Sequence, residues 1–391
     1  MRRLPFLLAL TALAACAADP DVVAGDEQPL VAYAASAKPV AADDFATPLT
    51  KTALRTAHAL PADAFAARWE ASLADPVLFL RAWPAAFHKD LAQVPVKRLL
   101  GGEGLCVGDA HPGNFGFVRF GSKTRYVYND LDDSGYCPVA IDAARYFAAV
   151  RVFWDDGDVL DEALEAYVDA VKDAGTAQAL DAGFAPDWAA VREKELADAT
   201  QGETFVMAGE LGPVSAATKK AVLSGVSSHP LVAGKSVLSV AALDRKSGGS
   251  GGLDRYWLLV AKGSSRTIVE CKEAASPGTE AGRNSKKLAP TQRLAILKAV
   301  FWNDKTASDN TYVTIAGRRF LVRDRLARKS LDVLNLDKKD RRHVLAVQAG
   351  ILAGLHAPRW SAVKKDEMRS WLKDTSKTLA KRWLAAYDVA Q

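Results

Sequence analysis

LCVGDAHPGNFGFVRFGSKTRYVYNDLDDSGYCP, residues 105–138, contains two short apolar runs that each lead into a cluster of polar side chains. The first run, 105–107, precedes an aspartate, a histidine and an asparagine, and the second, 126–128, precedes an asparagine and three aspartates. Short apolar runs beside Gly- and Asp-rich turns are typical of strands. We expect two strands to bring these side chains to one place: Asp109, His111, Asn114, Asn129, Asp130, Asp132 and Asp133.

Closely spaced carboxylates repel one another, so a group of them beside an amide favours a divalent cation. Mg²⁺ takes oxygen ligands and keeps positions open for phosphate. A carboxylate that is not a metal ligand can then orient a hydroxyl group or accept its proton. The alternative is that these segments are only turns. Two polar clusters after two strand-like runs make that alternative the weaker one.

The polar clusters resemble motifs of known kinases. GDAHPGN, residues 108–114, resembles the G-D-x-H-x-x-N loop of aminoglycoside-phosphotransferase-like kinases, and NDLDDSGYCP, residues 129–138, resembles their metal-binding segment. More closely still, FLR at 79–81, GDAHPGNFG, NDLDD, LDRYWLLV and CKEA resemble the bacterial domain-of-unknown-function 2252 family. This resemblance runs from about residue 75 to the end of the chain.

The resemblance implies an α+β, protein-kinase-like two-lobed fold with a mainly helical large lobe and a small antiparallel β lobe. It implies a phosphotransferase that uses ATP and Mg²⁺ on an unknown acceptor. In that scheme Asp109 orients the acceptor hydroxyl with His111 beside it in the catalytic loop. Asn114 and Asp130 bind Mg²⁺, and Asp132 assists.

Helical patterns place four further residues. A helix is expected from Pro138 to residue 153, in which Asp142 and Arg145 lie three apart and can pair on one face. The resemblance implies that Asp142 braces the catalytic loop. Arg81 and His356 also match family positions, but a solvated arginine and a structural histidine are the simpler interpretations.

Residues 235–274 predict the β lobe. Strand-like runs at 236–243, 253–260 and 267–272 flank the turn SGGSGG at 247–252. Backbone amides of such a turn can approach phosphate oxygens, and a lysine on a following strand can neutralise phosphate charge. On its own this turn would be a plain flexible hairpin. In this context it resembles a nucleotide-binding lobe, which implies ATP contacts from Gly248, Gly249, Ser250, Gly251, Gly252, Lys272 and Glu273.

The order of these motifs is unusual, because kinases place the glycine loop and the lysine before the catalytic loop. We therefore expect a circularly permuted kinase-like fold, since contacts rather than chain order define a core. The expected helix at 290–301 occupies the place where kinases carry a glutamate that pairs with the lysine. It contains Gln292 but no glutamate. Either Glu273 or Gln292 takes that role, or Lys272 is positioned otherwise.

The N-terminus predicts a lipid anchor. Arg2 and Arg3 precede an apolar run, and LAAC, residues 13–16, fits the motif after which Cys16 is acylated. The alternative is an ordinary signal peptide. Since Ala17 rather than aspartate follows the anchor, we expect a lipoprotein of the bacterial cell envelope, on the outer membrane facing the periplasm.

The expected organisation has five segments. They are a lipoprotein signal peptide (1–16), a flexible tether (17–43), a helical lobe with both polar clusters (44–234), a β-rich nucleotide-lobe-like segment (235–330) and C-terminal helices that pack on the helical lobe (331–391). Residues 202–234 mix Gly, Pro and Ser with short apolar runs and are interpreted as a connector or substrate-facing insert.

The composition of the chain limits the kinds of molecule that it is expected to bind. With 49% hydrophobic residues the chain can bury a large core, and its formal net charge of +5 falls to +3 without Arg2 and Arg3. That charge is too small and too evenly spread to favour nucleic acid. The expected partners are the membrane, through the lipid, and the unknown acceptor; the oligomeric state is left open.

Three cysteines remain after acylation of Cys16, namely Cys106, Cys137 and Cys271. In an oxidising compartment one pair can form a disulfide. Cys106 and Cys137 flank the two polar clusters, which favours their pairing over three free buried thiols. No C-x-x-C or His-rich spacing indicates zinc.

Two classes of function follow. The first is a phosphotransferase; the second is a kinase-shaped binding protein that holds a ligand without transfer, which the scarcity of ATP in the periplasm favours. Metal-dependent phosphoester hydrolysis would use the same carboxylates but lacks a histidine cluster for a second metal.

Overall fold

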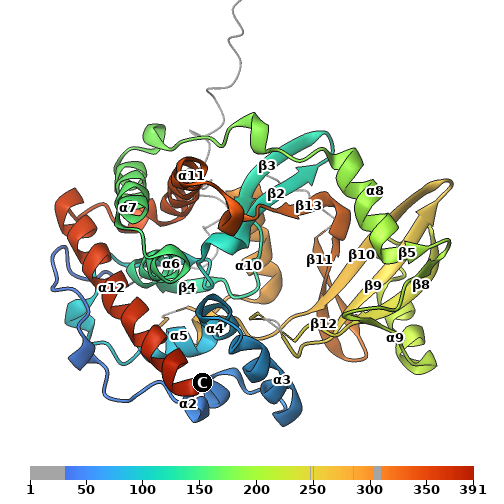
Figure 1. Ribbon diagram of the computed structural model, residues 1–391, viewed down its shortest axis with the longest axis horizontal. Helices are drawn as coiled ribbons and strands as arrows, with labels where there is room; N and C mark the ends of the chain where they lie inside the picture. Colours follow the sequence, from blue (N-terminus) through green and yellow to red (C-terminus); the bar gives the residue numbers. More distant parts are fainter. Residues whose placement is uncertain (1–30, 247, 250, 285, 303–309) are drawn as a thin grey trace, which may run out of the picture.

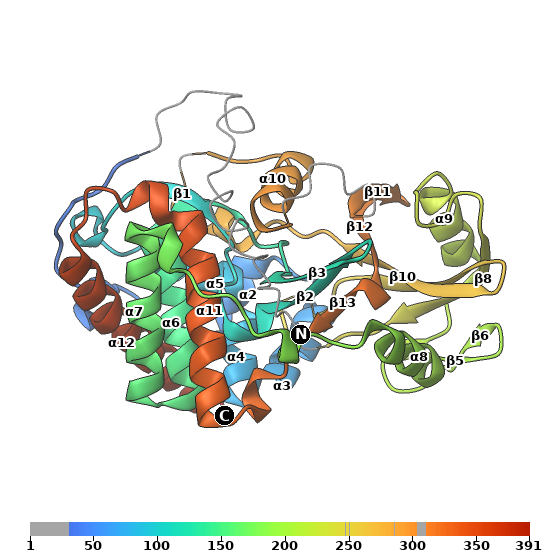
Figure 2. The same ribbon diagram turned by 90° about the horizontal axis from the view of Figure 1, so that it is seen from above.

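The computed structural model describes residues 31–391 except 247, 250, 285 and 303–309. It is an α+β protein, as predicted, and its named strands all pair antiparallel. Figure 1 shows helices gathered at one end and a six-stranded sheet at the other, with a smaller sheet between them. Figure 2 shows the same separation from above.

The helical part combines helices from both ends of the described chain. Its helices are α2 (Lys51–His58), α3 (Ala62–Ser72), α4 (Pro76–Ala82), α5 (Pro84–Leu91), α6 (Val139–Trp154), α7 (Gly157–Lys172), α11 (Lys338–His356) and α12 (Lys365–Ala390). α11 packs along α7, and α12 packs along α6 and α7. The C-terminal helices therefore complete the core that the earlier helices begin.

Helix α6 lies at the centre of this core. Residues 139–150 are all buried, as expected of a helix surrounded by protein on every side. Alanines at 140, 143, 144, 148 and 149 let neighbouring helices approach closely, while burial of each larger apolar side chain stabilises the fold by roughly 1.5–3 kcal/mol. Asp142 and Arg145 are the charged residues in this run, so their partners determine whether their burial is tolerated.

Local sequence signals set the helix starts. The Asp75 carboxylate accepts a hydrogen bond from the Leu78 amide at 2.8 Å, and Pro76 occupies the first turn of α4, as is typical of an Asp-Pro pair at a helix start. Asp156 and Asp337 cap α7 and α11 in the same way. None of the helices in the described part of the chain is long and apolar enough to cross a membrane.

The large sheet has the strand order β11-β12-β10-β9-β8-β7. Side chains alternate along β10, so Val269 and Cys271 pack in an apolar core with α9, whereas Glu270 and Lys272 point to the opposite side. The strands and their two helices are β7 (Leu211–Gly212), β8 (Ser236–Leu243), β9 (Arg255–Lys262), β10 (Ser265–Glu273), β11 (Thr311–Ile315), β12 (Arg318–Asp324), α8 (Trp188–Ala199) and α9 (Ala216–Val226).

Smaller sheets connect the two parts. β2 (Phe115–Phe120) and β3 (Lys123–Tyr128) form a hairpin, to which β13 (Arg328–Ser330) adds a third strand. β1 (Glu103–Cys106) pairs with β4 (Gly135–Pro138), and β5 (Thr200–Gln201) pairs with β6 (Thr204–Phe205). α10 (Pro290–Leu297) continues into a π-helical turn, Lys298–Trp302.

Two segments differ from their sequence-based description. The predicted tether, 17–43, is packed from residue 31 onward: the Tyr33 hydroxyl donates to Glu103 at 2.9 Å, and Val40 is buried. The predicted connector at 202–234 contains α9, whose Val222 and Val226 are buried against the large sheet. Residues 1–30, with Cys16, lie outside the described residues.

A disulfide joins Cys106 and Cys137, with Cα atoms 5.8 Å apart, which confirms the predicted pairing. The bond links β1 to β4 and closes a loop that contains both polar clusters. Cys271 is free and buried in β10, where burial raises the pKa of its thiol.

Replacing both Cys106 and Cys137 by serine is expected to lower the free energy of unfolding by about 3 kcal/mol, because a closed loop of this length restricts the unfolded chain. Urea denaturation with and without dithiothreitol measures this change in the free energy of unfolding. Reduction should destabilise the wild type and Cys271→Ala equally and leave the double variant unchanged. Equal stability of the wild type in both conditions would contradict the prediction.

Candidate functional site: a charged cavity between helices and sheet

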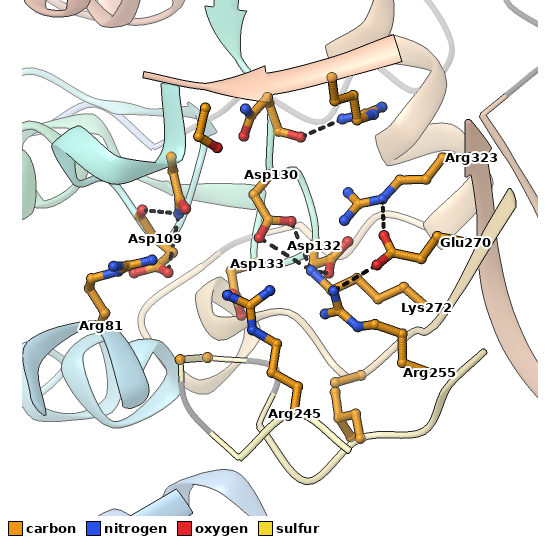
Figure 3. Close-up of a pocket in the computed structure, with 18 of the residues that line it drawn as sticks. Arg81, Asp109, Asp130, Asp132, Asp133, Arg245, Arg255, Glu270, Lys272 and Arg323 are labelled. Atoms are coloured by element: carbon orange, nitrogen blue, oxygen red, sulfur yellow. Dashed lines mark hydrogen bonds and ion pairs between the residues drawn. The ribbon is translucent and has the colours of Figure 1, made fainter. Parts of the chain in front are cut away.

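A cavity of about 290 Å³ lies where the helical part, the small sheet and the large sheet meet. Its wall is strongly charged, as Figure 3 shows. The cationic side chains in it are Arg81, Arg245, Arg255, Lys272, Arg323, Arg325 and Arg328. The carboxylates are Asp109, Asp130, Asp132, Asp133, Glu210 and Glu270. His111, Asn114, Gly248 and Gly249 also line it, so most of the predicted site residues reach one place.

The Asp109 carboxylate is held on both oxygens. One oxygen accepts from the Arg145 Nε at 3.2 Å and from its Nη2, while the other lies 3.4 Å from the His111 Nε2 and 3.3 Å from the Asn114 Nδ2. Burial opposes ionisation, but the Arg145 and His111 interactions outweigh it and hold the pKa of Asp109 well below its usual range. Asp109 is therefore an ionised, oriented acceptor, better suited to positioning a hydroxyl group than to retaining its proton.

His111 supports this arrangement from the loop. Its Nδ1 accepts from the Gly113 amide at 3.1 Å, which leaves the proton on Nε2, the atom nearest Asp109. Burial lowers the pKa of the imidazole, so it stays neutral. Asn114 Nδ2 also donates to the Asp109 carbonyl at 3.0 Å and to the Tyr128 hydroxyl at 3.1 Å. Its Oδ1 makes no hydrogen bond to the residues that the structure describes.

Asp142 fixes the start of the GDAHPGN loop, residues 108–114. Its carboxylate accepts from the amides of Val107 at 2.8 Å and Gly108 at 2.9 Å. His356 Nε2 lies 3.1 Å from the same carboxylate, and its Nδ1 lies 2.7 Å from the Tyr167 hydroxyl. Asp142 therefore braces the loop as predicted, but its partner is His356, while Arg145 turns to Asp109.

Glycine is required at position 108. Its φ is +79°, and a Cβ there would lie 1.9 Å from the Asp133 carbonyl oxygen. This close approach places the GDAHPGN loop against the NDLDD segment.

His356→Ala is expected to lower the free energy of unfolding by roughly 1–3 kcal/mol, because it removes one hydrogen-bond partner from each of the buried Asp142 and Tyr167 side chains. Tyr167→Phe leaves the contact between His356 and Asp142 in place and should cost less. Urea denaturation of both variants measures the difference. A histidine variant as stable as the wild type would show that this contact does not stabilise the loop.

Lys272 connects the large sheet to the acidic segment, NDLDD at residues 129–133. From β10 its Nζ lies 2.9 Å from the Asp130 Oδ1 and 3.2 Å from its Oδ2, and it also contacts the Asp132 Oδ2. Burial opposes ionisation of Asp130, yet Lys272 and then Arg323 keep the pKa of Asp130 well below its usual range. Two of the predicted metal ligands and the predicted phosphate-binding lysine thus lie in direct contact.

Asp133 differs from its neighbours. Its Oδ1 accepts from the Gly278 amide at 2.9 Å, and no cation is paired with it among the described residues. Burial and the nearby charges of Asp109, Asp132 and Asp130 raise its pKa to about 7. Without a bound cation, the acidic segment therefore carries a proton near neutral pH.

Glu270 organises the charged side of the large sheet. It pairs with Arg255 at 3.0 Å and with Arg323 at 2.5 Å, from the strands on either side of β10. Burial opposes ionisation, but Arg323 and Arg255 keep the pKa of Glu270 well below its usual range. Sequence reasoning missed this cluster because it combines three strands that are separated in the chain.

The glycine turn lies only partly in the cavity. Gly248 and Gly249 line it, whereas the Gly251 carbonyl accepts from Arg68 Nε at 2.8 Å. The Gly251 amide donates to the Gly248 carbonyl and the Gly252 amide to the Arg245 carbonyl, so they are not free to bind phosphate. Ser250 lies outside the described residues.

Neither of the two residues considered as partners of Lys272 contacts it in the structure. Glu273 accepts from the Asp254 amide at 2.9 Å and pairs with Arg318 at 3.1 Å. Gln292 accepts from the Ala289 amide at the start of α10. Neither contacts Lys272, which is positioned instead by Asp130 and Asp132.

The acidic segment can supply part of the coordination shell of a cation, with a bound ligand supplying the rest. Asp130 and Asp132 converge on one ammonium group, and the Asn114 Oδ1 is unengaged among the described residues. Within those residues, the only group of three potential metal ligands that converge closely is Cys106, Cys137 and Asp142, and its cysteines are in a disulfide. Such an incomplete set suits Mg²⁺, which uses one or two carboxylates together with substrate phosphates.

The cavity also contains cations that sequence analysis did not assign. Arg81 was expected to be solvated, but from α4 it points into the cavity toward Asp109, and Arg245 enters from the end of β8 (Figure 3). The FLR motif that contains Arg81 was a signal for this role. Arg245 is exposed like Lys246 beside it, and nothing in the local sequence indicates that Arg245 is the one that lines the cavity.

Fold and cavity together define an α+β protein with a cleft suited to cations and phosphate groups. The model of the family described as "Uncharacterized protein conserved in bacteria (DUF2252)" matches residues 61–223 and 237–391. The chain belongs to this bacterial family, as its motifs indicated. No curated protein and no solved structure matches it.

Proposed function

We propose that this protein is a Mg²⁺-dependent phosphotransferase with a kinase-like, circularly permuted fold, which transfers a phosphoryl group from ATP to a hydroxyl group. The observation that supports this most is the convergence of Asp109, Asn114, Asp130, Asp132 and Lys272 on one cavity from two parts of the fold. Separately each residue type has many roles; together they are the set that phosphoryl transfer requires.

The two-part architecture supports the kinase-like assignment. The six-stranded sheet takes the place of a nucleotide lobe, and the helical part with the Asp109 loop takes that of a catalytic lobe. The strands that carry Lys272 follow the catalytic loop in the chain, so the permutation belongs to the proposal.

Each side chain has a defined task in this reaction. Asp109 accepts a hydrogen bond from the acceptor hydroxyl and aims its oxygen at phosphorus, and Asn114, Asp130 and Asp132 hold Mg²⁺. The ion, when bound, neutralises negative charge on the phosphate oxygens. Lys272 supplies further positive charge to the donor. A P–O bond to the acceptor forms, the P–O bond to the leaving nucleoside diphosphate breaks, and the hydroxyl proton passes by way of the Asp109 carboxylate to solvent.

One observation favours a second candidate, a kinase-shaped protein that binds a ligand without transfer. Lys272 is engaged by the carboxylates that would hold the metal, and α10 offers no carboxylate to draw it away. The two candidates differ in turnover rather than in binding.

Titration calorimetry with ATP and Mg²⁺ tests the nucleotide site. We expect metal-dependent binding that weakens at least tenfold, about 1.4 kcal/mol, in Asp130→Asn and Lys272→Met. Lys262→Met, which removes an exposed lysine at the far end of β9, is the matched control and should bind like the wild type. No binding at millimolar nucleotide would exclude ATP as the donor. Binding with slow release of phosphate that Asp109→Asn abolishes would favour transfer over the second candidate.

The lipid anchor at Cys16 and the location facing the periplasm are part of the proposal. The disulfide between Cys106 and Cys137 supports an oxidising compartment. Such a location requires a phosphoryl donor outside the cytoplasm.

Cells that express the full chain are expected to incorporate labelled palmitate into it, because acylation of Cys16 attaches the protein to the membrane. Incorporation should disappear in Cys16→Ala and persist in Cys271→Ala. Label in the Cys16 variant would place the lipid elsewhere, and no label in the wild type would favour an ordinary signal peptide.

A further inference from the structure

The cations of the cavity divide into two groups. Five have partners: Arg255 and Arg323 pair with Glu270, Lys272 with Asp130 and Asp132, and Arg325 with Glu195, while Arg328 donates to the Asn129 carbonyl and to Asn310. Arg81 and Arg245 have no ion pair and no side-chain hydrogen bond with any residue that the structure describes. These two guanidinium groups are therefore the ones left for a ligand.

Arg81 is held where an anion would meet it beside the catalytic loop. Its Nε is sealed from solvent and lacks a hydrogen-bond acceptor, an arrangement that is costly unless a partner arrives. Its guanidinium carbon lies 3.6 Å from the position that a Cβ at Gly113 would occupy. Asp109 does not neutralise it, because both oxygens of that carboxylate are engaged by Arg145, His111 and Asn114.

Arg245 reaches the same cavity from the large sheet. Its backbone carbonyl accepts from the Gly252 amide at 3.0 Å, which fixes the root of the side chain in the glycine turn. The side chain lines the cavity wall but remains exposed to solvent. Partial burial and the nearby charges of Arg255 and Arg81 lower the pKa of the guanidinium, while Glu210 and Glu270 oppose the shift. A bound anion would stabilise the two guanidinium groups that have no ion pair.

Figure 3 sets Arg81 apart from the predicted donor site, and Arg245 lies between the two. Arg81 lies on the side of the cavity occupied by Asp109, whereas Lys272 lies with Glu270 and Arg255 on the sheet side. An anion held by Arg81 and Arg245 would lie beside the carboxylate that orients the acceptor hydroxyl.

We propose that Arg81 and Arg245 form an anion site for the acceptor, so that the acceptor is a hydroxyl compound that already carries a phosphate group. Arginine suits phosphate because its planar group donates two parallel hydrogen bonds, and a dianion balances two guanidinium charges. This assignment to the acceptor rests on the proposed phosphotransferase function, whereas the anion site itself does not.

Inorganic phosphate is the probe for the site. It should raise the melting temperature of the full-length protein and give saturable heat in calorimetry without nucleotide or metal. Arg81→Gln and Arg245→Gln should each weaken phosphate binding at least tenfold, and Arg81→Lys, which keeps the charge, should weaken it less. Arg119→Gln, at an exposed position of β2 outside the cavity, is the matched control and should bind phosphate like the wild type.

Three outcomes would overturn the proposal. The first is a wild type that does not bind phosphate, or glutamine variants that are folded by circular dichroism and bind it unchanged. The second is acetate that binds as tightly as phosphate at equal ionic strength, which would indicate a carboxylate on the acceptor. The third is loss of ATP binding in Arg81→Gln and Arg245→Gln, which would assign the pair to the donor. Phosphate binding that persists in a protein with no affinity for ATP would instead overturn the nucleotide proposal and leave the anion site standing.

Discussion

The carboxylate of Asp142, buried in α6, accepts hydrogen bonds from the amides of Val107 and Gly108, where the GDAHPGN loop begins, and the position of Asp109 depends on it. A charge at the centre of a core is tolerated only if it is fully paired. Here two amides and His356 supply the pairing, and Tyr167 orients the imidazole in turn. One turn further along α6, Arg145 holds the Asp109 side chain itself. A single central helix therefore positions both the backbone and the carboxylate of the loop.

The opposite wall of the cavity depends on the alternation of side chains along β10. Glu270 and Lys272 point toward the acidic segment because Val269 and Cys271 are buried on the other side of the sheet. Glu270 balances two arginines, which leaves Lys272 to contact Asp130 and Asp132. The contact between lysine and aspartates is therefore the electrostatic link between the sheet and the acidic segment.

Elements with a local signal were predictable from the sequence. The strand at 236–243, the Asp75-Pro76 helix start and the disulfide that encloses both polar clusters all follow from neighbouring residues or their spacing. Helix α9 was missed because its Gly-, Pro- and Ser-containing surroundings show no clear period. The sequence left open whether Glu273, Gln292 or another group positions Lys272, and the group comes from a segment about 140 positions earlier, which no local signal indicates. Arg81 and Arg245 acquire their role only from the carboxylates that are already occupied around them.

The order of the elements along the chain has a mechanical consequence. The chain enters the large sheet for β7 to β10, returns to the acidic segment, where Arg293 donates to the Ser134 carbonyl, and enters the sheet again for β11 and β12. The chain therefore crosses between the two walls of the cavity four times, in addition to the hydrogen bond from Arg68 to the glycine turn. Any displacement of one wall relative to the other has to be accommodated in every one of these crossings and not at a single hinge.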